Sequence, residues 1–231
     1  MWPPHAVAHD GDVRVERCFA FVDLCGFTAF TEHFGDERTV VMLAAFRTRV
    51  REIAARRGVR VTKWLGDGAM LSSVDTQGVV AMVLELDSTN PAALPLEIRA
   101  GLARGPVIMF EGDDYIGRAT NVASRLCDLA TPGQVLATRE VVSQVPRWVE
   151  AFDASLYPAH GFDRPLEAST LRVGTGPTMI TDPWCGLVLP VVTGLDTRFG
   201  PDGSVQRFCS TACALSWEEN QREPPALVSL E

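Results

Sequence analysis

The stretch VTKWLGDGAML, residues 61–71, decides the fold that we expect for this chain. Its two apolar parts, VTKWL and AML, flank GDG, which is a turn signal between strands. We therefore predict a hairpin whose flanks are largely buried. Lys63 and Asp67 lie in this hairpin, and a charge in such surroundings needs a partner or a function. Lys63 is also the only lysine in the chain. The alternative is a purely structural hairpin, with a turn aspartate and a lysine whose amine reaches solvent.

The chain upstream of this hairpin predicts a strand and then a helix. Residues 17–24 are an apolar run of strand length, interrupted near its end by Asp23, as is typical of a central strand covered on both faces. Residues 37–57 carry apolar side chains at spacings of three and four, with arginines on the opposite side, which indicates an amphipathic helix. Gly58 follows as a helix-terminating glycine.

Downstream, short segments alternate between helix and strand patterns. We predict helices over residues 75–86, 119–129 and 139–144, strands over residues 94–103, 107–110 and 134–138, and a polar turn over residues 112–117. Together with the hairpin and the upstream strand and helix, these segments predict an α+β sandwich in which helices pack on one sheet.

Composition and charge restrict the function. A length of 231 residues suits one sizeable domain with at most a small appendage. The net charge of −8 argues against a surface for nucleic acid or for anionic membranes, because both reward clustered Lys and Arg. No apolar run approaches the roughly 20 residues that span a bilayer, and the N-terminal residues lack a signal-peptide pattern. We expect a cytoplasmic protein with no nucleic-acid or membrane partner.

Two carboxylates stand where predicted strands end. Asp23 ends the strand over residues 17–24, and Asp67 lies in the turn of the hairpin. If the two strands are neighbours, both carboxylates meet at one edge of the sheet. Such a pair suits Mg²⁺ or Mn²⁺, which prefer oxygen ligands and bridge to substrate phosphates. The structural alternatives are that Asp23 caps the following helix and that Asp67 only forms the turn.

Three groups of residues resemble the catalytic motifs of class III nucleotidyl cyclases. They are FVDLCGFT (21–28), KWLGD (63–67) and DYIG followed by NVASR (114–117 and 121–125), in the order of that family and at compatible spacing. PGQV (132–135) and GFDRPLE (161–167) resemble its closing segments. The resemblance covers roughly residues 15–173 and implies a ferredoxin-like βαββαβ sandwich.

The resemblance assigns the metal ligands. Asp23 and Asp67, helped by the backbone carbonyl of Leu24, would hold two divalent cations, Mg²⁺ or Mn²⁺. One cation would activate the ribose 3′-hydroxyl for in-line attack on the α-phosphate, and the other would neutralise the triphosphate and the leaving pyrophosphate.

The resemblance also assigns the residues that bind the nucleotide. Lys63 and Asp114 match the pair that reads the base, in which a Lys donor suits adenine N1 and an Asp acceptor suits the exocyclic amine. Asn121 matches the residue that orients the ribose. Arg125 matches the cation that stabilises charge developing on the phosphate, and the spacing of four residues places it on the same helix face as Asn121.

The implied function is adenylyl cyclase, which converts ATP to 3′,5′-cyclic AMP and pyrophosphate. In the family, the active sites lie between two cyclase domains, of which one supplies the metal carboxylates and the other the base-reading pair with Asn and Arg. This chain carries both sets in one domain, so the resemblance implies a homodimer with two equivalent sites. A guanylyl cyclase, and a catalytically silent cyclase fold that serves in metal sensing or dimerisation, are the alternatives.

Three positions complicate the match. His160 stands where many members have a lysine that reaches the triphosphate. Pro106 stands where some members carry a phosphate-binding arginine, although Arg104 is near in the sequence. Asp113 adjoins Asp114, so a shift of one residue in the match would exchange their roles.

The change in composition after residue 171 predicts further organisation. We divide the chain into a leader (1–14), a catalytic domain (15–173), a Gly/Pro/Thr-rich linker (174–181), a small module (182–219) and a tail (220–231). A segment of about 40 residues cannot bury a stable core without a staple.

The small module has the pattern of a metal site. DPWCG (182–186) and FCSTAC (208–213) resemble the ends of a YHS or TRASH-type metal module. Cys209 and Cys213, four residues apart on a short helix, can present both sulfurs to one ion, and a returning loop brings Cys185. Thiolates suit Zn²⁺ or Cu⁺. The alternative is three unligated thiols in a small core; the fourth ligand is not evident, with Asp182 as the candidate.

Overall fold

The computed structural model describes residues 14–88, 95–111 and 114–222. The elements run in the order β1 (Arg14–Leu24), α1 (Phe27–Arg57), β2 (Arg60–Leu65), β3 (Gly68–Ser73), α2 (Thr76–Ser88), β4 (Ile98–Phe110), β5 (Asp114–Ile116), α3 (Arg118–Leu129), β6 (Val135–Ala137), α4 (Arg139–Val142), β7 (Val149–Tyr157), β8 (Leu166–Val173), β9 (Met179–Thr181), β10 (Val188–Pro190), β11 (Asp196–Phe199), β12 (Val205–Phe208) and α5 (Thr211–Arg222). The predicted leader and tail lie almost entirely outside the described residues.

One mixed sheet forms the centre of the molecule, with the strand order β2-β3-β1-β4-β6-β8-β7 and with β5 paired to β4. Its first four strands are antiparallel neighbours. With α1 and α2 as the connections, they have the βαββαβ topology that the resemblance implied. The α+β, ferredoxin-like prediction is therefore confirmed, and β6, β7 and β8 extend the sheet beyond it.

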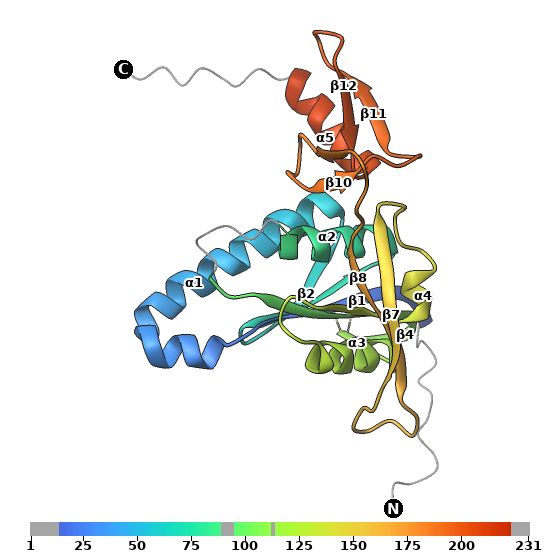
Figure 1. Cartoon of the computed structure of the whole chain (residues 1–231). Helices are drawn as coiled ribbons and strands as arrows, with labels where there is room; N and C mark the ends of the chain where they lie inside the picture. Colours follow the sequence, from blue (N-terminus) through green and yellow to red (C-terminus); the bar gives the residue numbers. More distant parts are fainter. Residues whose placement is uncertain (1–13, 89–94, 112–113, 223–231) are drawn as a thin grey trace, which may run out of the picture.

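Strand β1 is an interior strand of the sheet, between β3 and β4, and its side chains are apolar on both faces. Cys18, Ala20 and Val22 belong to the core that includes α1 and α2, whereas Phe19 belongs to the core under α3. Such burial on both faces fits the continuous apolar run in the sequence. Figure 1 shows the result, with α1 and α2 on one side of the sheet and α3 on the other.

Helix α1 begins ten residues earlier than the apolar periodicity predicted, at Phe27. Gly35 lies inside it with φ 80° and ψ 169°, which interrupts the helix with a kink. The left-handed conformation at that position favours glycine, so the FGDE sequence does not end the helix but bends it. Gly58 closes it with φ 62° and a backbone N–H bonded to the carbonyls of Ala54 and Ala55, as predicted.

Three predicted segments of the central region differ from the structure. The strands expected at 94–103 and 107–110 are one strand, β4, that runs through Pro106. Among the described strands, pairing on the side of β4 away from β1 stops at Leu102 and resumes at Ile108, and a proline is tolerated where a strand has a free side. The expected polar turn ends early, because Asp114 already belongs to strand β5.

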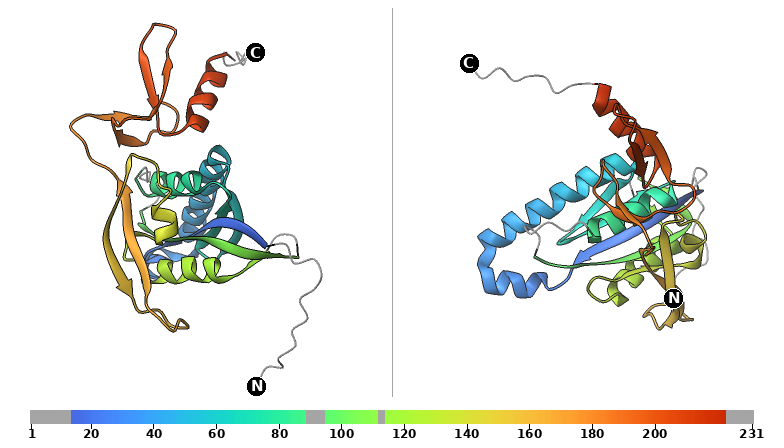
Figure 2. Two further views of the ribbon diagram at one scale, coloured as in Figure 1. Left: turned by 90° about the vertical axis from the view of Figure 1, so that its right-hand side faces the viewer. Right: turned by 45° about the horizontal axis from the view of Figure 1, so that its top comes forward.

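The C-terminal module packs on the end of α1 and α2 (Figures 1 and 2). It consists of two small hairpins, β9–β10 and β11–β12, followed by α5. Part of the expected linker forms β9, and α5 extends into the expected tail. Leu187, Leu189 and Phe208 are fully buried and join the same hydrophobic core as α1 and α2. The module therefore shares its core with the sheet domain, which compensates for its small size.

Candidate functional site

The hairpin brings Asp67 to the end of β1, where Asp23 lies. Strands β1 and β3 are antiparallel neighbours with Val22 opposite Ala69, so the turn before β3 closes over the last residues of β1. At Gly68 a Cβ atom would lie 2.6 Å from the Val22 carbonyl oxygen and 3.1 Å from Asp23 Oδ1. Only glycine permits this approach. The two carboxylates thus meet at one edge of the sheet, next to the buried Leu24.

An arginine that the sequence did not single out binds the first of these carboxylates. Arg99 lies opposite Asp23 in the β1–β4 register, and its Nε and Nη2 donate to Asp23 Oδ2 at 3.1 and 2.7 Å. Its Nη1 donates to the backbone carbonyl of Asp128 in α3 at 3.1 Å. Asp23 is therefore paired with Arg99 and does not cap α1, which has no side-chain cap. The signal in the sequence was a charge within the apolar run IRAGLA.

The charges around this edge favour a cation. Burial raises the pKa of the Asp67 carboxyl, and the nearby Asp23 carboxylate raises it further, although the backbone N–H of Asp67 and the charge of Arg99 oppose the shift. The hydrogen bond to Asp23 raises the pKa of Arg99. Two carboxylates held this close repel each other unless a positive charge lies between them. Together with the Leu24 backbone, they offer the oxygen ligands that Mg²⁺ and Mn²⁺ prefer.

Lys63 and Asp114 meet although they come from different strands. Lys63 lies on β2 and Asp114 begins β5, and the ammonium nitrogen is 2.5 Å from Asp114 Oδ2. Hydrogen bonds from Lys63 and from the Tyr115 backbone N–H lower the pKa of the Asp114 carboxyl. The prediction that the hairpin flanks are largely buried was wrong for β2, because the Lys63 side chain is 44% exposed. Asp113 lies outside the described residues.

Asn121 and Arg125 share the exposed face of α3, as their spacing predicted. The opposite face of this helix is buried through Val122 and Leu126. Arg125 Nη1 lies 2.9 Å from Asp128 Oδ2 one turn later, and both side chains are about half exposed. The pair is a weak surface contact, so Arg125 can turn to another anion at little cost.

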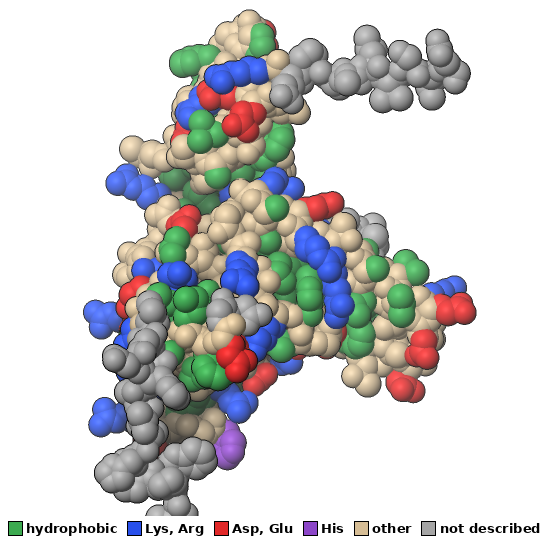
Figure 3. Space-filling view, turned by 180° about the vertical axis from the view of Figure 1, so that it is seen from behind, with side chains coloured by type: hydrophobic (Ala, Val, Ile, Leu, Met, Phe, Trp, Pro, Cys, Tyr) green, Lys and Arg blue, Asp and Glu red, His purple; other side chains and the backbone are tan. Residues whose placement is uncertain are grey.

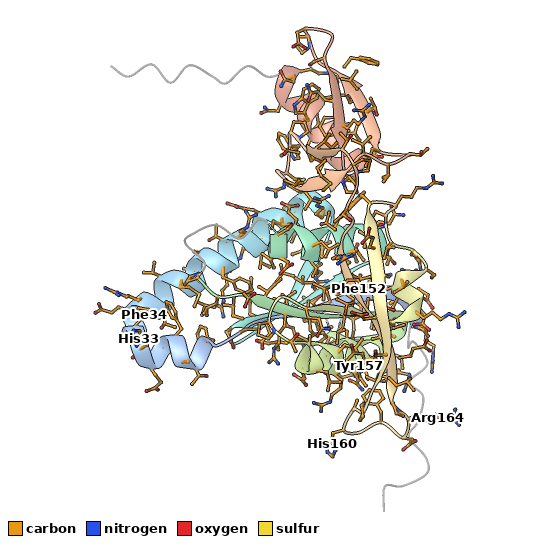
Figure 4. The ribbon with its side chains drawn as sticks, in the orientation of Figure 1. His33, Phe34, Phe152, Tyr157, His160 and Arg164 are labelled. Atoms are coloured by element: carbon orange, nitrogen blue, oxygen red, sulfur yellow. The ribbon has the colours of Figure 1, made fainter. Side chains whose placement is uncertain are left out.

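The two other residues considered for the triphosphate lie elsewhere. His160 is exposed on the loop between β7 and β8, which also carries Arg164, at the end of the molecule away from the C-terminal module (Figure 4). Arg104 donates to the Val74 carbonyl at 3.1 Å and to Thr76 Oγ1 at 3.0 Å, at the start of α2. Arg104 therefore connects β4 to α2, while Pro106 stays within the sheet.

The C-terminal module gathers its three cysteines with Asp182. The ligand atoms of Asp182, Cys185, Cys209 and Cys213 all lie within 4.8 Å of one another. Cys209 Sγ is 3.7 Å from Cys185 Sγ and 3.6 Å from Cys213 Sγ. A tetrahedral ion with Zn–S bonds of about 2.3 Å would separate its sulfurs by about 3.8 Å. The four groups therefore fit one thiolate-bound metal ion.

Hydrogen bonds prepare this cluster for its charge. Asp182 Oδ1 accepts from the Trp184 backbone N–H at 2.8 Å, and Oδ2 accepts from the Cys209 backbone N–H at 2.8 Å, so one fully buried carboxylate joins both cysteine loops. Hydrogen bonds from Cys185 and Cys209 lower the pKa of the Cys213 thiol, while those with Cys209 and Cys213 raise the pKa of Cys185, so Cys213 is the first of the pair to ionise. A thiol with a low pKa is a ready metal ligand.

Within the described residues, no helix is both long enough and apolar enough to cross a membrane. Burial raises the pKa of the Cys18 and Cys127 thiols to about 12, and both lie in the core of the sheet domain. They are inert fillers, in contrast to the C-terminal cysteines.

Comparisons with known proteins show which family and which solved structures the chain is similar to. The family described as "Adenylate and Guanylate cyclase catalytic domain" matches residues 14–155. An uncharacterized protein of Mycobacterium tuberculosis is 33% identical over 167 residues, which are 72% of this chain and 44% of that protein. An adenylate cyclase of Streptomyces coelicolor is 32% identical over 148 residues, 62% of this chain and 38% of that protein. The crystal structure of the adenylyl cyclase CyaB from P. aeruginosa superposes with a TM-score of 0.66 at 25% identity, covering 72% of this chain and 98% of CyaB. The chain spans under half the length of these curated relatives.

Proposed function

The chain belongs to the adenylate and guanylate cyclase catalytic-domain family, and from that premise we propose that it is an adenylyl cyclase. The reaction is the conversion of ATP to 3′,5′-cyclic AMP and pyrophosphate. The observation that carries the choice of ATP is the contact between Lys63 and Asp114. It puts a positive donor and a negative acceptor side by side at a partly exposed position.

These two groups have the polarity that adenine requires. The Watson–Crick edge of adenine presents an acceptor, N1, beside a donor, the exocyclic amine. The Lys63 ammonium can donate to the first and the Asp114 carboxylate can accept from the second. Guanine presents the opposite order, with O6 as acceptor and N1–H as donor. The Lys63 ammonium would then face a donor, and the Asp114 carboxylate would face an acceptor. Unpaired polar groups in a binding site are the strongest source of such discrimination.

The carboxylate pair is proposed to hold the divalent cations of the reaction. Asp23, Asp67 and the Leu24 carbonyl supply oxygen ligands, and the positive charge of Arg99 already lies at this position. Two Mg²⁺ or Mn²⁺ ions bound there would supply Lewis-acid activation of the ribose 3′-hydroxyl and neutralisation of the triphosphate. The chain's own part is to fix the carboxylates through the tight turn at Gly68.

The exposed face of α3 is proposed to bind the ribose and the reacting phosphate. Asn121 would orient the ribose through its amide. Arg125 would leave Asp128 and donate to the α-phosphate as negative charge develops there, a contribution that grows toward the transition state. Their spacing of four residues sets both groups on one side of the nucleotide.

A second copy of this chain is the proposed partner. Leu65, Phe110 and Ile116 are exposed by 46%, 46% and 54%, and they lie on the strands that carry Lys63 and Asp114 or next to them. Figure 3 shows apolar and basic side chains next to one another on the rear face of the molecule. A two-fold homodimer would cover such apolar side chains and set the metal carboxylates of one copy against the nucleotide-binding residues of the other.

The cluster of Asp182 and three cysteines is proposed to bind Zn²⁺ or Cu⁺. Its support is the sulfur separations of 3.6 and 3.7 Å, which match a tetrahedral thiolate site. A resident ion would supply the staple that a small module needs. With ATP as its substrate and unpaired cysteines, the protein is proposed to work in the cytoplasm.

The test is the turnover of two nucleotides by the purified full chain. Wild-type protein with Mn²⁺ should form cyclic AMP from ATP, measured by chromatography, and far less cyclic GMP from GTP. Asp67→Asn, which keeps the shape of the side chain, should reduce turnover by at least about 100-fold, because the cation loses a charged ligand. Asp153→Asn is the matched control, on an exposed left-handed residue of β7 that asparagine also tolerates.

Equal turnover by Asp67→Asn and wild type would contradict the proposed mechanism. No cyclic nucleotide from either substrate would indicate a catalytically silent cyclase fold. Preferred turnover of GTP would contradict the role of Lys63 and Asp114.

A further inference from the structure

The thiol cluster is not confined to the C-terminal module, because a buried arginine of the sheet domain contacts it. Arg57, the last residue of α1, is 5% exposed. Its Nη1 donates to Cys209 Sγ at 2.9 Å and its Nη2 donates to Cys185 Sγ at 3.3 Å. These contacts join residues that are 152 and 128 positions apart in the chain. The guanidinium thus donates hydrogen bonds to two of the three sulfurs from outside the cluster.

The position of this guanidinium is fixed from the other side by Glu85 of α2. Arg57 Nε and Nη2 donate to Glu85 Oε2 at 3.0 and 2.7 Å, and the Glu85 side chain is fully buried. Arg56, the preceding residue, also contacts Glu85 but contacts neither sulfur. The planar guanidinium of Arg57 is therefore held in a fixed orientation. One side of it donates to the Glu85 carboxylate and the other donates to the cysteine sulfurs.

The charges explain why an arginine belongs there. Three thiolates and the Asp182 carboxylate carry four negative charges, of which a divalent ion neutralises two. A buried site with that excess is unfavourable unless a further cation lies against it. An arginine guanidinium keeps its positive charge in proteins even when it is buried. The guanidinium stays charged and can offset the excess.

Other contacts join the same two parts of the chain. Trp148, in the loop before β7, is 2% exposed and donates from Nε1 to the Cys209 backbone carbonyl at 2.9 Å. A cavity of about 500 Å³ lies beside these groups and is lined from both sides, by Arg57, Asp75 and Trp148 of the sheet domain and by Cys209 and Asp196 of the module. Figure 2 shows the module seated at this end of α1 and α2.

We propose that the metal centre is an interdomain site, in which Arg57, held by Glu85, positions the thiolates of the C-terminal module and makes metal binding depend on its docking to the sheet domain. The inference rests on the proposed metal site, and it adds the sheet domain as part of that site. Metal binding and docking then stabilise each other by linkage. Because α1 runs from the turn after Asp23 to Arg57, the metal centre lies at the far end of the helix that begins at the catalytic edge.

The first test measures metal affinity in the full chain. Zn²⁺ is titrated against a chromophoric chelator with wild type, Arg57→Ala, Arg57→Lys and the matched control Arg56→Ala. Loss of an outer-shell partner of a metal ligand typically weakens binding 10- to 100-fold, so we expect that loss for Arg57→Ala, a smaller one for Arg57→Lys and less than about threefold for Arg56→Ala. If Arg57→Ala does not fold, Arg57→Lys alone carries the comparison, because lysine keeps the charge but loses the fork.

The second test separates positioning from general stability. The protein is loaded with Co²⁺ and its thiolate-to-cobalt charge-transfer band is recorded. Removal of the guanidinium hydrogen bonds raises the electron density on the sulfurs, so the band of Arg57→Ala and Arg57→Lys should move to longer wavelength while that of Arg56→Ala stays in place. A protease can also be used to cleave residues 174–178, the part of the linker before β9. This cleavage should slow on Zn²⁺ addition in wild type and not in Arg57→Ala.

A third variant distinguishes failure of this inference from failure of the metal site itself. Cys213→Ser removes a proposed ligand and should abolish tight Zn²⁺ binding. If it does so while Arg57→Ala keeps the affinity and the band of wild type, the metal site stands and its interdomain nature is overturned. If Cys213→Ser binds Zn²⁺ as wild type does, both proposals are overturned.

Discussion

Arg99 and Asp23 face each other directly across the β1–β4 pair, and two guanidinium nitrogens of Arg99 donate to a single oxygen of Asp23. Oδ1 of Asp23 points instead toward Gly68 of the hairpin. The carboxylate thus has one oxygen held by a resident cation and one directed to the turn that carries Asp67. Arg99 therefore supplies a positive charge at the edge of the sheet where we propose that the divalent cations bind.

Replacement of Arg99 should make the stability of the protein depend on divalent cations. In Arg99→Ala, Asp23 loses the guanidinium that pairs with it, so the free energy of unfolding in a chelator should fall by about 1 kcal/mol, the value of a partly exposed ion pair. Excess Mn²⁺ should restore most of that loss, because the cation replaces the guanidinium. The measurement is urea unfolding with and without Mn²⁺. Arg172→Ala, which breaks an exposed pair with Glu150, should respond equally in both conditions; the same result for Arg99→Ala would contradict the role of Arg99.

Lys63 and Asp114 should act on ATP as a unit. Lys63→Ala and Asp114→Ala should each lower kcat/KM for ATP by about 10- to 100-fold, the value of one charged hydrogen bond. The double variant should lose less than the product of the two single effects, because the side chains contact each other. Steady-state kinetics of the four proteins test this expectation. Independent effects that multiply would show that the two residues do not bind the same base.

The choice of ATP over GTP should be insensitive to pH near neutrality. The pKa of Asp114 lies below its ordinary value, because Lys63 and the Tyr115 N–H donate to its carboxylate. Asp114 therefore keeps its charge until the pH falls below the usual range for aspartate, and the ratio of the two kcat/KM values should stay constant between about pH 6 and pH 9. If the ratio of kcat/KM for ATP to kcat/KM for GTP changed with pH within this range, a group other than Asp114 would have to read the base.

Asp87 should destabilise the fold at neutral pH. Burial raises its pKa to about 6, and Glu97 adds to the shift; the residue also lies at the C-terminal end of α2, where negative charge is unfavourable. A raised carboxyl pKa means that ionisation costs stability, and the cost grows as the pH rises from the unfolded pKa toward about 6. Asp87→Asn should thus increase the free energy of unfolding by about 1 kcal/mol at about pH 8, after allowance for partial exposure, and hardly at all near pH 4.

A second aspartate provides the control of opposite sign for Asp87→Asn. Hydrogen bonds from Ser204 lower the pKa of Asp202, so Asp202→Asn should destabilise the protein at neutral pH, and this effect should shrink as the pH falls. Denaturant unfolding at the two pH values measures both variants. An Asp87→Asn effect that is as large near pH 4 as at pH 8 would contradict the raised pKa.

Removal of metal should expose three thiols to alkylation. In Zn²⁺-loaded protein, Cys185, Cys209 and Cys213 should be protected as ligands, whereas a chelator should make them reactive. Cys18 and Cys127 should remain slow in both states, because their pKa values are about 12. Peptide mass spectrometry after a brief treatment with iodoacetamide identifies each site. An unchanged set of labelled cysteines would argue against a thiolate-bound metal.

The elements of the fold that have local sequence signals could be predicted. The turn at residues 66–68 identified the hairpin, continuous apolar character identified β1, and glycine identified the end of α1. By contrast, β7 was not predicted, because it is mostly exposed and lacks a clear alternation. Strand β8 was not predicted either, although buried and more exposed residues alternate over its first half. The division of β4 into two strands was wrong. Gly105 and Pro106 are local signals for a strand break, but the sequence does not show that this part of β4 is paired on one side only.

The residues of the site divide in the same way. Asp23, Asp67, Lys63 and Asp114 could be proposed from motifs, and the structure brings each pair together, while their roles remain proposals. Arg99 and Arg57 were not identified as site residues, since the partner of each lies on a distant element: Arg99 is 76 residues from Asp23, and the charge within the apolar run IRAGLA did not indicate that partner. Only the register of the sheet and the docking of the C-terminal module create those contacts.

The claim that each active site is built from two copies of the chain is tested most directly by mixing two inactive variants. Asp67→Asn lacks a metal carboxylate and Asn121→Ala lacks the ribose contact, and each homodimer has two defective sites. Co-expression forms heterodimers as about half of all dimers, each with one intact and one doubly defective site, so cyclic AMP formation should recover to about a quarter of wild type. Activity of the mixed protein no higher than that of the separate variants would show that the two residues serve the same site of one chain.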